Sequence, residues 1–363
     1  MVGILLLEPL ASFAAPAVTA ANGSVADGST IVISGSGFGS KSPAKPYLWA
    51  PMDGSINPSS LGVVTSWSRM GQMAYGGSCG AGGGGCMEGT RSNGVGTNDW
   101  TAAILSPASS DWNDYGQETY VYRKSKKTFD YDSAKNVKSI RFWGQASNGG
   151  LQAPNFYFGS SLGRVGIEGI PTVYADYSMA PATLVTAKGP IGSWYTEEMS
   201  VKANSDSNSA DADFRLAVNG GPYLVQFPNQ TWMTNGFKIK TDSGYANDGR
   251  MRILFPVHMV VEGSDGWIPS ISGSQYWVDD VYVDTTWQRV MIGDSPQFTS
   301  CTVREIQIPT AWSDGSISVV ANLKAFPAGK NKYLFVVDRS GNASPGFPLS
   351  NAPRPNAATI SVQ

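Results

Sequence analysis

Two pairs of adjacent carboxylates, Glu197–Glu198 and Asp279–Asp280, have the residue type that can cleave a glycosidic bond. Such cleavage needs two carboxylates that flank one bond from the same side. Neighbouring residues of a strand point to opposite faces of a sheet, so we expect neither pair to act on one substrate. Asp280 and Asp284 share strand parity, and the polar surface of an edge strand explains them more simply.

His258 is the only histidine in the chain, and Arg252 lies on the same polar side of its predicted strand. A polysaccharide lyase needs a base beside the C5 proton of its substrate and a group that neutralises the substrate carboxylate. Tyr157, Arg141 or Arg215 from other strands would complete such a site. A single histidine on a sheet is more often structural or merely exposed, so catalysis is the weaker interpretation.

The polar faces of several predicted strands carry aromatic and cationic side chains that suit binding better than catalysis. Aromatic faces stack on sugar rings and arginine pairs with carboxylates, so an acidic polysaccharide fits them. These side chains could instead cover a sheet face beneath a loop or a neighbouring domain, and both interpretations stay open. The candidate ligand-binding residues are Arg141, Trp143, Tyr157, Arg215, Arg252 and His258.

Cys79 and Cys86 flank a glycine-rich stretch that lets the chain close a small loop, which predicts a disulfide in an oxidising compartment. Zinc is the weaker alternative, because the chain has no second cysteine pair and a single histidine. The third cysteine, Cys301, is expected to be a small buried apolar residue. The turns at Asp206, Asp211 and Asp213 could supply calcium ligands but lack EF-hand spacing, so we predict no metal and no cofactor.

The composition favours sheets and disfavours nucleic acid as a partner. Charged residues make up 15% and aromatic residues 11% of the 363 residues, a balance that suits strands better than long amphipathic helices. The formal net charge of −2 gives no electrostatic footprint for DNA or RNA. The basic run from Arg123 to Lys127 is expected to form the solvated edge of a strand.

The first twenty residues imitate a signal peptide without matching one. An apolar GILLL run is followed by AAPAVTA, but no basic residue precedes the run and Glu8 interrupts it. The run is also too short to span a bilayer as a helix. We therefore expect residues 1–19 to form an N-terminal arm docked on a neighbour, and no membrane span.

Alternation of apolar and polar residues, rather than helical periodicity, dominates the chain. The odd-numbered residues from Ile253 to Val261 form one predicted apolar face, and Arg252 and His258 fall on the other. Segments such as 139–145 alternate in the same way. Short strands separated by turns rich in glycine, asparagine and aspartate predict an all-β sandwich.

Residues 25–41 (VADGSTIVISGSGFGSK) resemble the opening of an IPT/TIG domain, an immunoglobulin-like module with a GxGFG element. That element is here residues 35–39, in which glycine permits positive φ and Phe38 would fill the core. REIQIPTAWSDGSISVV and KYLFVVDRSGNASPG resemble the remaining strands of the module. The resemblance implies one Ig-like domain, residues 20–44 and 286–363, interrupted by a large insertion. Two separate small Ig-like units are the alternative.

The inserted residues 45–285 resemble the concanavalin A-like or laminin-G-like jelly roll. YLWAPMDG resembles its opening strand, residues 192–221 its central strand pair, and SQYWVDDVYVD its closing strand. Proteins with this fold include lectins, glycoside hydrolases, polysaccharide lyases and adhesion modules, so the fold does not choose among these functions.

The combined resemblance implies a non-catalytic structural or adhesion protein with glycan binding. It would be a bacteriophage decoration or fibre protein on the virion surface, or a bacterial adhesin at the cell surface or outside the cell. The alternative is a secreted polysaccharide lyase, a glycoside hydrolase or a carbohydrate-binding module. Half-polar strand edges lead us to expect a homo-oligomer or a larger assembly.

Overall fold

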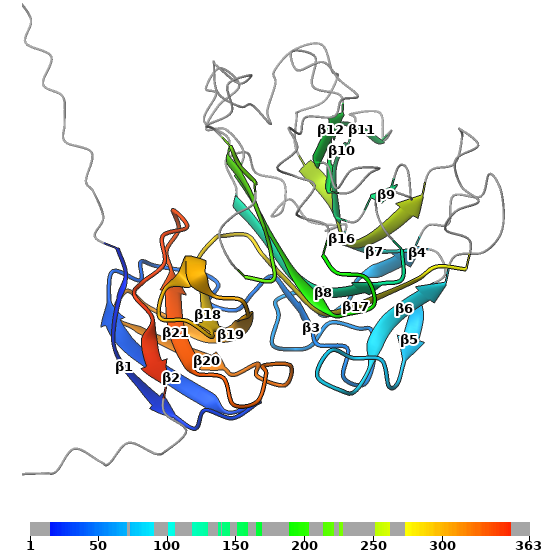
Figure 1. Cartoon of the computed structure of the whole chain (residues 1–363). Helices are drawn as coiled ribbons and strands as arrows, with labels where there is room; N and C mark the ends of the chain where they lie inside the picture. The colour runs from blue at the N-terminus through cyan, green and yellow to red at the C-terminus, as the bar shows by residue number, and fades with distance from the viewer. Residues whose placement is uncertain are drawn as a thin grey trace, which may run out of the picture.

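The described part of the chain consists of strands and turns, with a 3-10 turn at Phe298–Ser300 (Figure 1). It is all-β, as the alternation predicts, and its strands form three sheets. None of its elements is a helix that could cross a membrane. The computed structural model describes residues 15–70, 73–90, 101–105, 118–129, 137–138, 140–145, 151–158, 165–168, 189–202, 213–220, 225–227, 251–261 and 273–349.

The strands nearest the two ends of the chain share one seven-stranded sheet, here named the terminal sheet (Figure 1). The early strands join the late ones where Ile33 pairs with Ile317. In sheet order its strands are β1 (Ala17–Gly23), β2 (Thr30–Ser36), β20 (Ser316–Val320), β19 (Arg304–Trp312), β18 (Arg289–Gly293), β21 (Lys332–Val337) and β22 (Phe347–Leu349).

Phe38 lies in the core of the terminal sheet, where the glycine-rich segment was expected to place it. Its side chain is fully buried together with Ile33 and Ile317. Gly37 and Gly39 have positive φ values of 71° and 68°, which glycine adopts without steric cost. These local expectations are confirmed, while the assignment to the IPT/TIG family stays a prediction.

The strands between residues 48 and 284 form two further sheets, which build the jelly-roll β-sandwich that the sequence predicts. The central sheet has, in order, β15 (Val225–Phe227), β14 (Asp213–Val218), β13 (Tyr195–Lys202), β8 (Glu118–Lys127), β17 (Gln275–Asp284), β6 (Cys86–Thr90) and β5 (Ala74–Gly76), with β3 (Leu48–Ala50) paired to β17. The distal sheet has β12 (Val165–Glu168), β11 (Leu151–Phe158), β10 (Ile140–Gln145), β16 (Met251–Val261), β7 (Thr101–Leu105) and β4 (Ser68–Met70), with β9 (Val137–Lys138) paired to β16.

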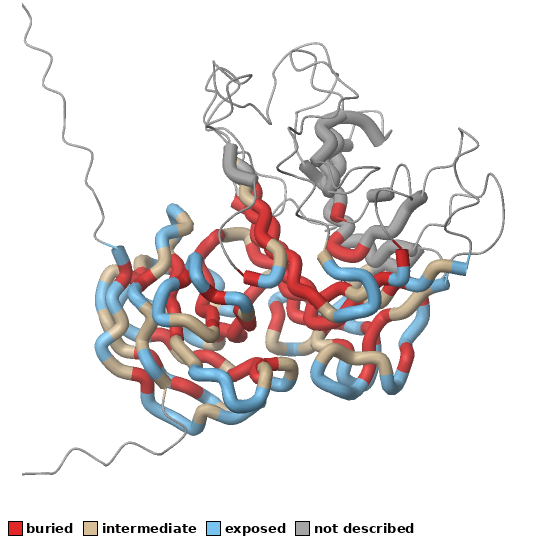
Figure 2. The backbone as a smooth tube through the Cα atoms, in the orientation of Figure 1, coloured by how far each residue is buried: buried red, intermediate tan, exposed pale blue. Residues whose placement is uncertain are grey.

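The central sheet lies between the other two sheets and uses both of its faces. One face carries Tyr120 and Tyr282, which share a buried core with Met291 of the terminal sheet. The other face meets the distal sheet, where Nη1 of Arg123 donates to the carbonyl of Pro256 at 2.9 Å. Figure 2 shows the buried residues that run through this middle layer.

The basic run does not form a solvated edge, because β8 lies between β13 and β17. Arg123 and Lys127 are fully buried and Lys124 is 3% exposed. Nε of Arg123 donates to Glu197 of β13 at 2.7 Å. The prediction is wrong because carboxylates from distant parts of the chain neutralise Arg123 and Lys124, and Lys127 donates to the carbonyl of Gly189. Buried charges are tolerated when they are paired.

β17 is also an internal strand rather than the predicted edge strand. Asp284 at its end is buried and accepts a hydrogen bond from Nζ of Lys41 at 2.5 Å. The hydroxyl of Tyr282 donates to the same carboxylate at 2.7 Å. Asp284 therefore belongs to a buried ion pair, not to a polar surface.

Candidate functional site

The distal sheet brings together most of the predicted ligand-binding positions. β10 lies between β11 and β16, and Arg141 pairs directly with Tyr157 on one side and with Phe255 on the other. Directly paired residues lie on the same face of a sheet. Trp143, two residues along β10, shares that face.

A β-bulge in β16 moves His258 to the face of Arg141. Leu254 and Val257 are three residues apart, yet their partners in β7 are only two residues apart. The extra residue reverses the alternation, so the predicted apolar face of this strand is wrong beyond the bulge. Pro256 lies within the bulge, where a residue that cannot donate a ladder hydrogen bond is tolerated.

Buried residues mark the opposite face of the distal sheet as the sandwich interior. Ile140 and Val257 are fully buried. The register puts both on the face opposite Arg141. The remaining face is the outer one, and we name four of its positions the distal face: Arg141, Trp143, Tyr157 and His258.

Arg252 has no regular pairing partner that would place it on the distal face, and Arg215 lies in a different sheet. Arg252 is the unpaired residue of a second bulge in β16. Arg215 belongs to β14 of the central sheet, so the predicted shared groove does not include it. Its guanidinium lies 4.5 Å from the ring centre of Trp287 and 2.8 Å from Asp213. Arg215 therefore covers a sheet face beneath the terminal sheet, which is the alternative that the sequence left open.

The two glutamates of β13 point to opposite faces, as predicted. Glu197 faces the distal sheet and accepts hydrogen bonds from Arg123 and from Ser125, each at 2.7 Å. Glu198 faces the terminal sheet and accepts a hydrogen bond from Nε of Arg304 at 2.9 Å. They cannot act on one substrate.

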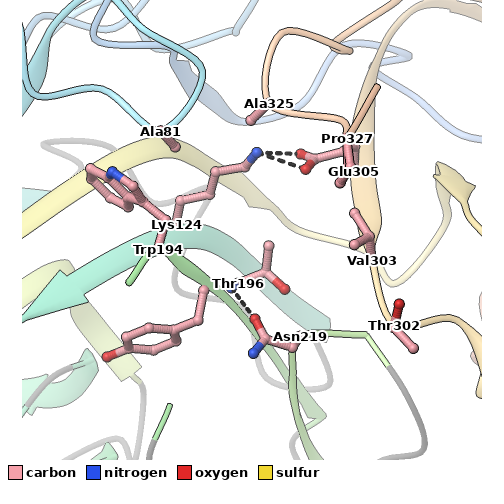
Figure 3. Close-up of a pocket in the computed structure, with 11 residues that line it drawn as sticks. Ala81, Lys124, Trp194, Thr196, Asn219, Thr302, Val303, Glu305, Ala325 and Pro327 are labelled. Atoms are coloured by element: carbon pink, nitrogen blue, oxygen red, sulfur yellow. Dashed lines mark hydrogen bonds and ion pairs between the residues drawn. The ribbon is translucent and has the colours of Figure 1, made fainter. Parts of the chain in front are cut away.

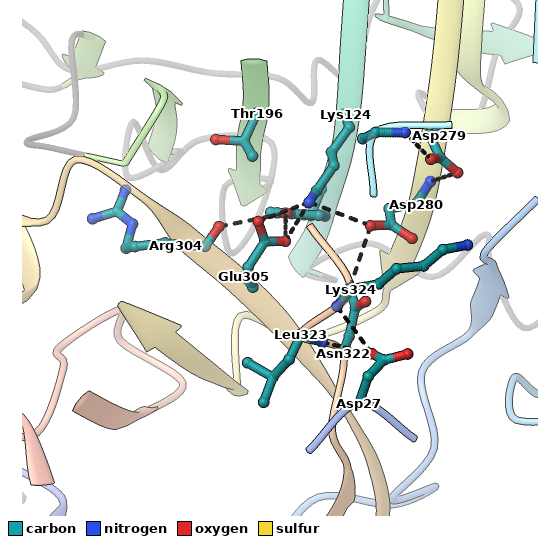
Figure 4. Close-up of polar contacts among 12 residues, drawn as sticks. Asp27, Lys124, Thr196, Asp279, Asp280, Arg304, Glu305, Asn322, Leu323 and Lys324 are labelled. Atoms are coloured by element: carbon teal, nitrogen blue, oxygen red, sulfur yellow. Dashed lines mark hydrogen bonds and ion pairs between the residues drawn. The ribbon is translucent and has the colours of Figure 1, made fainter. Parts of the chain in front are cut away.

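The two aspartates of β17 do not point to opposite faces, so the corresponding prediction is wrong. The register between β17 and β8 shifts after Asp279, and Asp280 has a φ of 51°. This bulge turns the Asp280 carboxylate toward Lys124, while the neighbouring Asp279 carboxylate is bonded to backbone N–H groups (Figure 4). Nζ of Lys124 lies 3.5 Å from Asp280. Asp279 accepts a hydrogen bond from the backbone of Ala81 at 2.8 Å.

Two carboxylates, those of Asp280 and Glu305, therefore share the ammonium group of Lys124 at the junction of the central and terminal sheets (Figure 4). We name Lys124, Asp279, Asp280 and Glu305 the junction cluster. Nζ of Lys124 lies 2.7 Å from Glu305, and the Tyr122 hydroxyl donates to the same carboxylate at 2.8 Å.

Burial of the carboxylates in the junction cluster shifts their protonation. Burial raises the pKa of Asp280 and of Glu305, and burial together with Asp280 raises the pKa of Asp279 to about 7. Burial opposes the charge of Lys124, but Glu305 and Asp280 outweigh it and its pKa is raised. The cluster therefore holds protons at pH values where exposed carboxylates have lost them.

A cavity of about 160 Å³ opens beside the junction cluster (Figure 3). Its wall combines an aromatic ring, hydroxyl groups, an amide and the Lys124–Glu305 ion pair. The residues used below are Lys124, Trp194, Thr196, Asn219 and Glu305. The sequence did not predict this cavity. Trp194 and Thr196 indicate only the start of a strand, and Glu305 lies more than a hundred residues away along the chain.

Cys79 and Cys86 form the predicted disulfide, with their Cα atoms 5.3 Å apart. Cys301 is buried, as predicted. Of the aspartate-rich turn considered for calcium, Asp206 lies outside the described residues and Asp213 is paired with Arg215.

No protein-family model and no curated protein matches the sequence. Among solved structures, the chain is similar to the endo-β-1,4-glucuronan lyase of the fungus Trichoderma reesei, at 14% identity and a TM-score of 0.46 over 67% of this chain and 96% of that one. It is similar to the PL-14 alginate lyase of Aplysia kurodai, at 11% identity and a TM-score of 0.41 over 59% and 87%. It is also similar to the alginate lyase vAL-1 of Chlorella virus, at 14% identity and a TM-score of 0.38 over 60% and 90%. These values describe a distant likeness of fold and say nothing of what this chain binds.

Proposed function

We propose that this protein binds an acidic polysaccharide on the distal face. The proposal rests on one observation: the register of three adjacent strands gathers Arg141, Trp143, Tyr157 and His258 on one outer face. Aromatic rings favour the faces of sugar rings, and arginine is suited to carboxylates. A polymer of uronic acids offers both groups in every residue.

The dimensions of the distal face suit an extended chain. Neighbouring strands lie about 4.8 Å apart and residues rise about 3.3 Å along each strand. The positions on β11, β10 and β16 therefore span roughly 10 Å across the strands, and His258 extends the surface by a similar length along β16. A linear polymer can follow such a surface, and no single pocket is needed.

The test is binding of the whole chain to polygalacturonate or alginate, compared with neutral dextran, by affinity electrophoresis and calorimetry. Arg141→Ala and Tyr157→Ala are expected to weaken binding to the acidic polymers by roughly tenfold each. Arg339→Ala is the matched control, because the Arg339 side chain is 68% exposed on the terminal sheet side. Equal binding of dextran, or binding that Arg141→Ala leaves intact, would contradict the proposal.

A second candidate function is β-elimination on the bound polymer, favoured by the position of His258 on the face of Arg141 and Tyr157. His258 would take the C5 proton while Arg141 neutralises the adjacent carboxylate. The electron pair then forms the C4–C5 double bond, and the C4 oxygen leaves with a proton from Tyr157. The readout is ultraviolet absorbance of the unsaturated product, which His258→Ala should abolish while binding persists. Binding without any such product would leave the binding proposal standing and refute the lyase.

We also propose that the protein acts outside the cytoplasm, as an adhesion or structural component at a cell or virion surface. The Cys79–Cys86 disulfide supports an oxidising setting. The native mass of the protein under non-reducing conditions tests this proposal together with the predicted homo-oligomer. Reduced cysteines in protein taken from its native source would count against the proposed location.

A further inference from the structure

An unpartnered hydroxyl lies in the wall of the cavity beside the junction cluster. Thr196 is 7% exposed, and its Oγ1 has no hydrogen-bond partner among the described residues. Its side chain rises from β13 between Lys124 and Thr302 (Figure 3). A buried polar group without a partner is costly, so this hydroxyl is suited to bond a molecule that occupies the cavity.

The neighbouring groups extend the hydrogen-bonding capacity of the cavity. Oδ1 of Asn219 accepts the backbone N–H of Thr196 at 3.1 Å, which fixes the amide and leaves its NH₂ group as a donor. Trp194, one residue before β13, is partly exposed and adds an aromatic ring to the same wall. A ring, a hydroxyl and an amide together suit a ligand that has an apolar face and several hydroxyl groups.

The size of the cavity suits one sugar ring. A protein cavity of about 150 Å³ holds benzene, and this one measures about 160 Å³. Sites for drug-sized molecules usually begin at about 300 Å³. A single six-membered ring therefore fits in this cavity.

The charges around the cavity select a neutral ligand. Among the described residues that line the cavity, Lys124 is the one cation. Its Nζ already lies 2.7 Å from Glu305 and 3.5 Å from Asp280. An anionic ligand would approach these carboxylates without gaining a free cation. Uronates and phosphorylated sugars are therefore disfavoured, whereas a neutral sugar meets no such repulsion.

We propose that this cavity binds one neutral pyranose ring, with Trp194 against the ring and with Thr196 and Asn219 bonded to its hydroxyl groups. The site lies between the central and terminal sheets. Its proposed ligand is neutral, whereas the polymer proposed for the distal face is anionic. It is therefore a second carbohydrate site, and it does not depend on the acidic-polysaccharide proposal.

The experiment is a titration of the whole chain with free D-glucose, D-galactose and D-glucuronate, followed by saturation-transfer NMR and calorimetry. We expect saturable, millimolar binding of a neutral hexose and none of glucuronate. Thr196→Val removes only the hydroxyl and is expected to weaken binding about tenfold. Trp194→Ala should weaken it at least as much. Thr310→Val is the matched control, because Thr310 lies in β19 outside the lining and its hydroxyl already bonds to Ser318.

The stability of the Thr196→Val variant without ligand gives a second readout. Since the Thr196 hydroxyl has no described partner, Thr196→Val should leave the unfolding midpoint unchanged or raise it. A lowered midpoint would show that the hydroxyl is satisfied without a ligand and would overturn the proposal. So would the absence of saturable hexose binding, equal binding of glucuronate, or binding that neither variant weakens. Arg141→Ala should retain hexose binding, so failure of the distal-face proposal remains distinguishable.

Discussion

The buried ion pairs around Glu198 allow a stability prediction that can be worked out from the structure. Oε1 of Glu198 accepts from Nε of Arg304, and Oε2 accepts from the Tyr120 hydroxyl, both at 2.9 Å. Arg289 lies 3.6 Å away. Burial alone would raise the pKa of Glu198, but Arg304 and Arg289 outweigh it and the pKa is lowered. Glu198 is therefore an ionised group that joins the central sheet to the terminal sheet.

Glu198→Gln keeps the size of the side chain and removes its charge. Two buried guanidinium groups, Arg289 and Arg304, then lose the negative charge of Glu198. Breaking a buried pair by removing one partner costs about 3–5 kcal/mol. With a urea m-value of about 2–3 kcal/mol/M, the unfolding midpoint should fall by roughly 1–2 M. Arg339→Ala breaks an ion pair whose arginine side chain is 68% exposed, and Lys202 remains 3.4 Å from the same Glu118 carboxylate, so it should change stability by less than about 1 kcal/mol.

The assay is urea unfolding followed by tryptophan fluorescence and circular dichroism. A double variant, Glu198→Leu with Arg304→Met, removes both charges and should be less destabilised than Glu198→Gln, because no uncompensated charge of that pair remains. The reasoning is refuted if Glu198→Gln shifts the midpoint no further than Arg339→Ala does.

Three further predictions concern the junction cluster, the disulfide and the core of the terminal sheet. The pKa of Asp279 rises from 3.8 to about 7 on folding, so the folded protein binds this proton more tightly than the unfolded chain does. The resulting contribution to the unfolding free energy is fully present below about pH 4 and is lost as the pH rises through 7. The loss amounts to at most about 4 kcal/mol, and Asp279→Asn should flatten the pH profile of the unfolding free energy between pH 4 and 8. Reducing the Cys79–Cys86 disulfide, which closes a short loop, should lower the unfolding free energy by about 2.5 kcal/mol, measured with and without reductant. Phe38→Ala should cost about 3–5 kcal/mol in urea unfolding, and a cost near zero would show that Phe38 is not a core residue.

Features governed by neighbouring residues could be predicted from the sequence. The positive φ of Gly37, the burial of Phe38 and the disulfide follow from local residue types and spacing. The opposite orientation of Glu197 and Glu198 follows from strand alternation alone. These expectations could be made from the sequence because each has a local signal in the chain.

Strand alternation alone could not predict the β-bulges. A single extra residue in β16 carries His258 to the face of Arg141, and another shift in β17 turns Asp279 and Asp280 to one side. Pro256 was a local signal for the first bulge, since proline in a central strand is tolerated at such a place. The charged residues around β17 carry no comparable signal, because the cation that receives them lies on another strand.

The middle layer explains why the two candidate sites lie where they do. Its charged residues serve both neighbouring sheets: Arg123 faces the distal sheet, while Lys124, the next residue, is paired with Glu305 of the terminal sheet. Because both faces of the central sheet are covered, a polymer cannot lie along either of them. The outer side of the distal sheet is the sandwich face that no other described sheet covers, and the register places the positions of Arg141 and His258 on it. At the covered junction a cavity for one ring remains, so any second ligand there must be small.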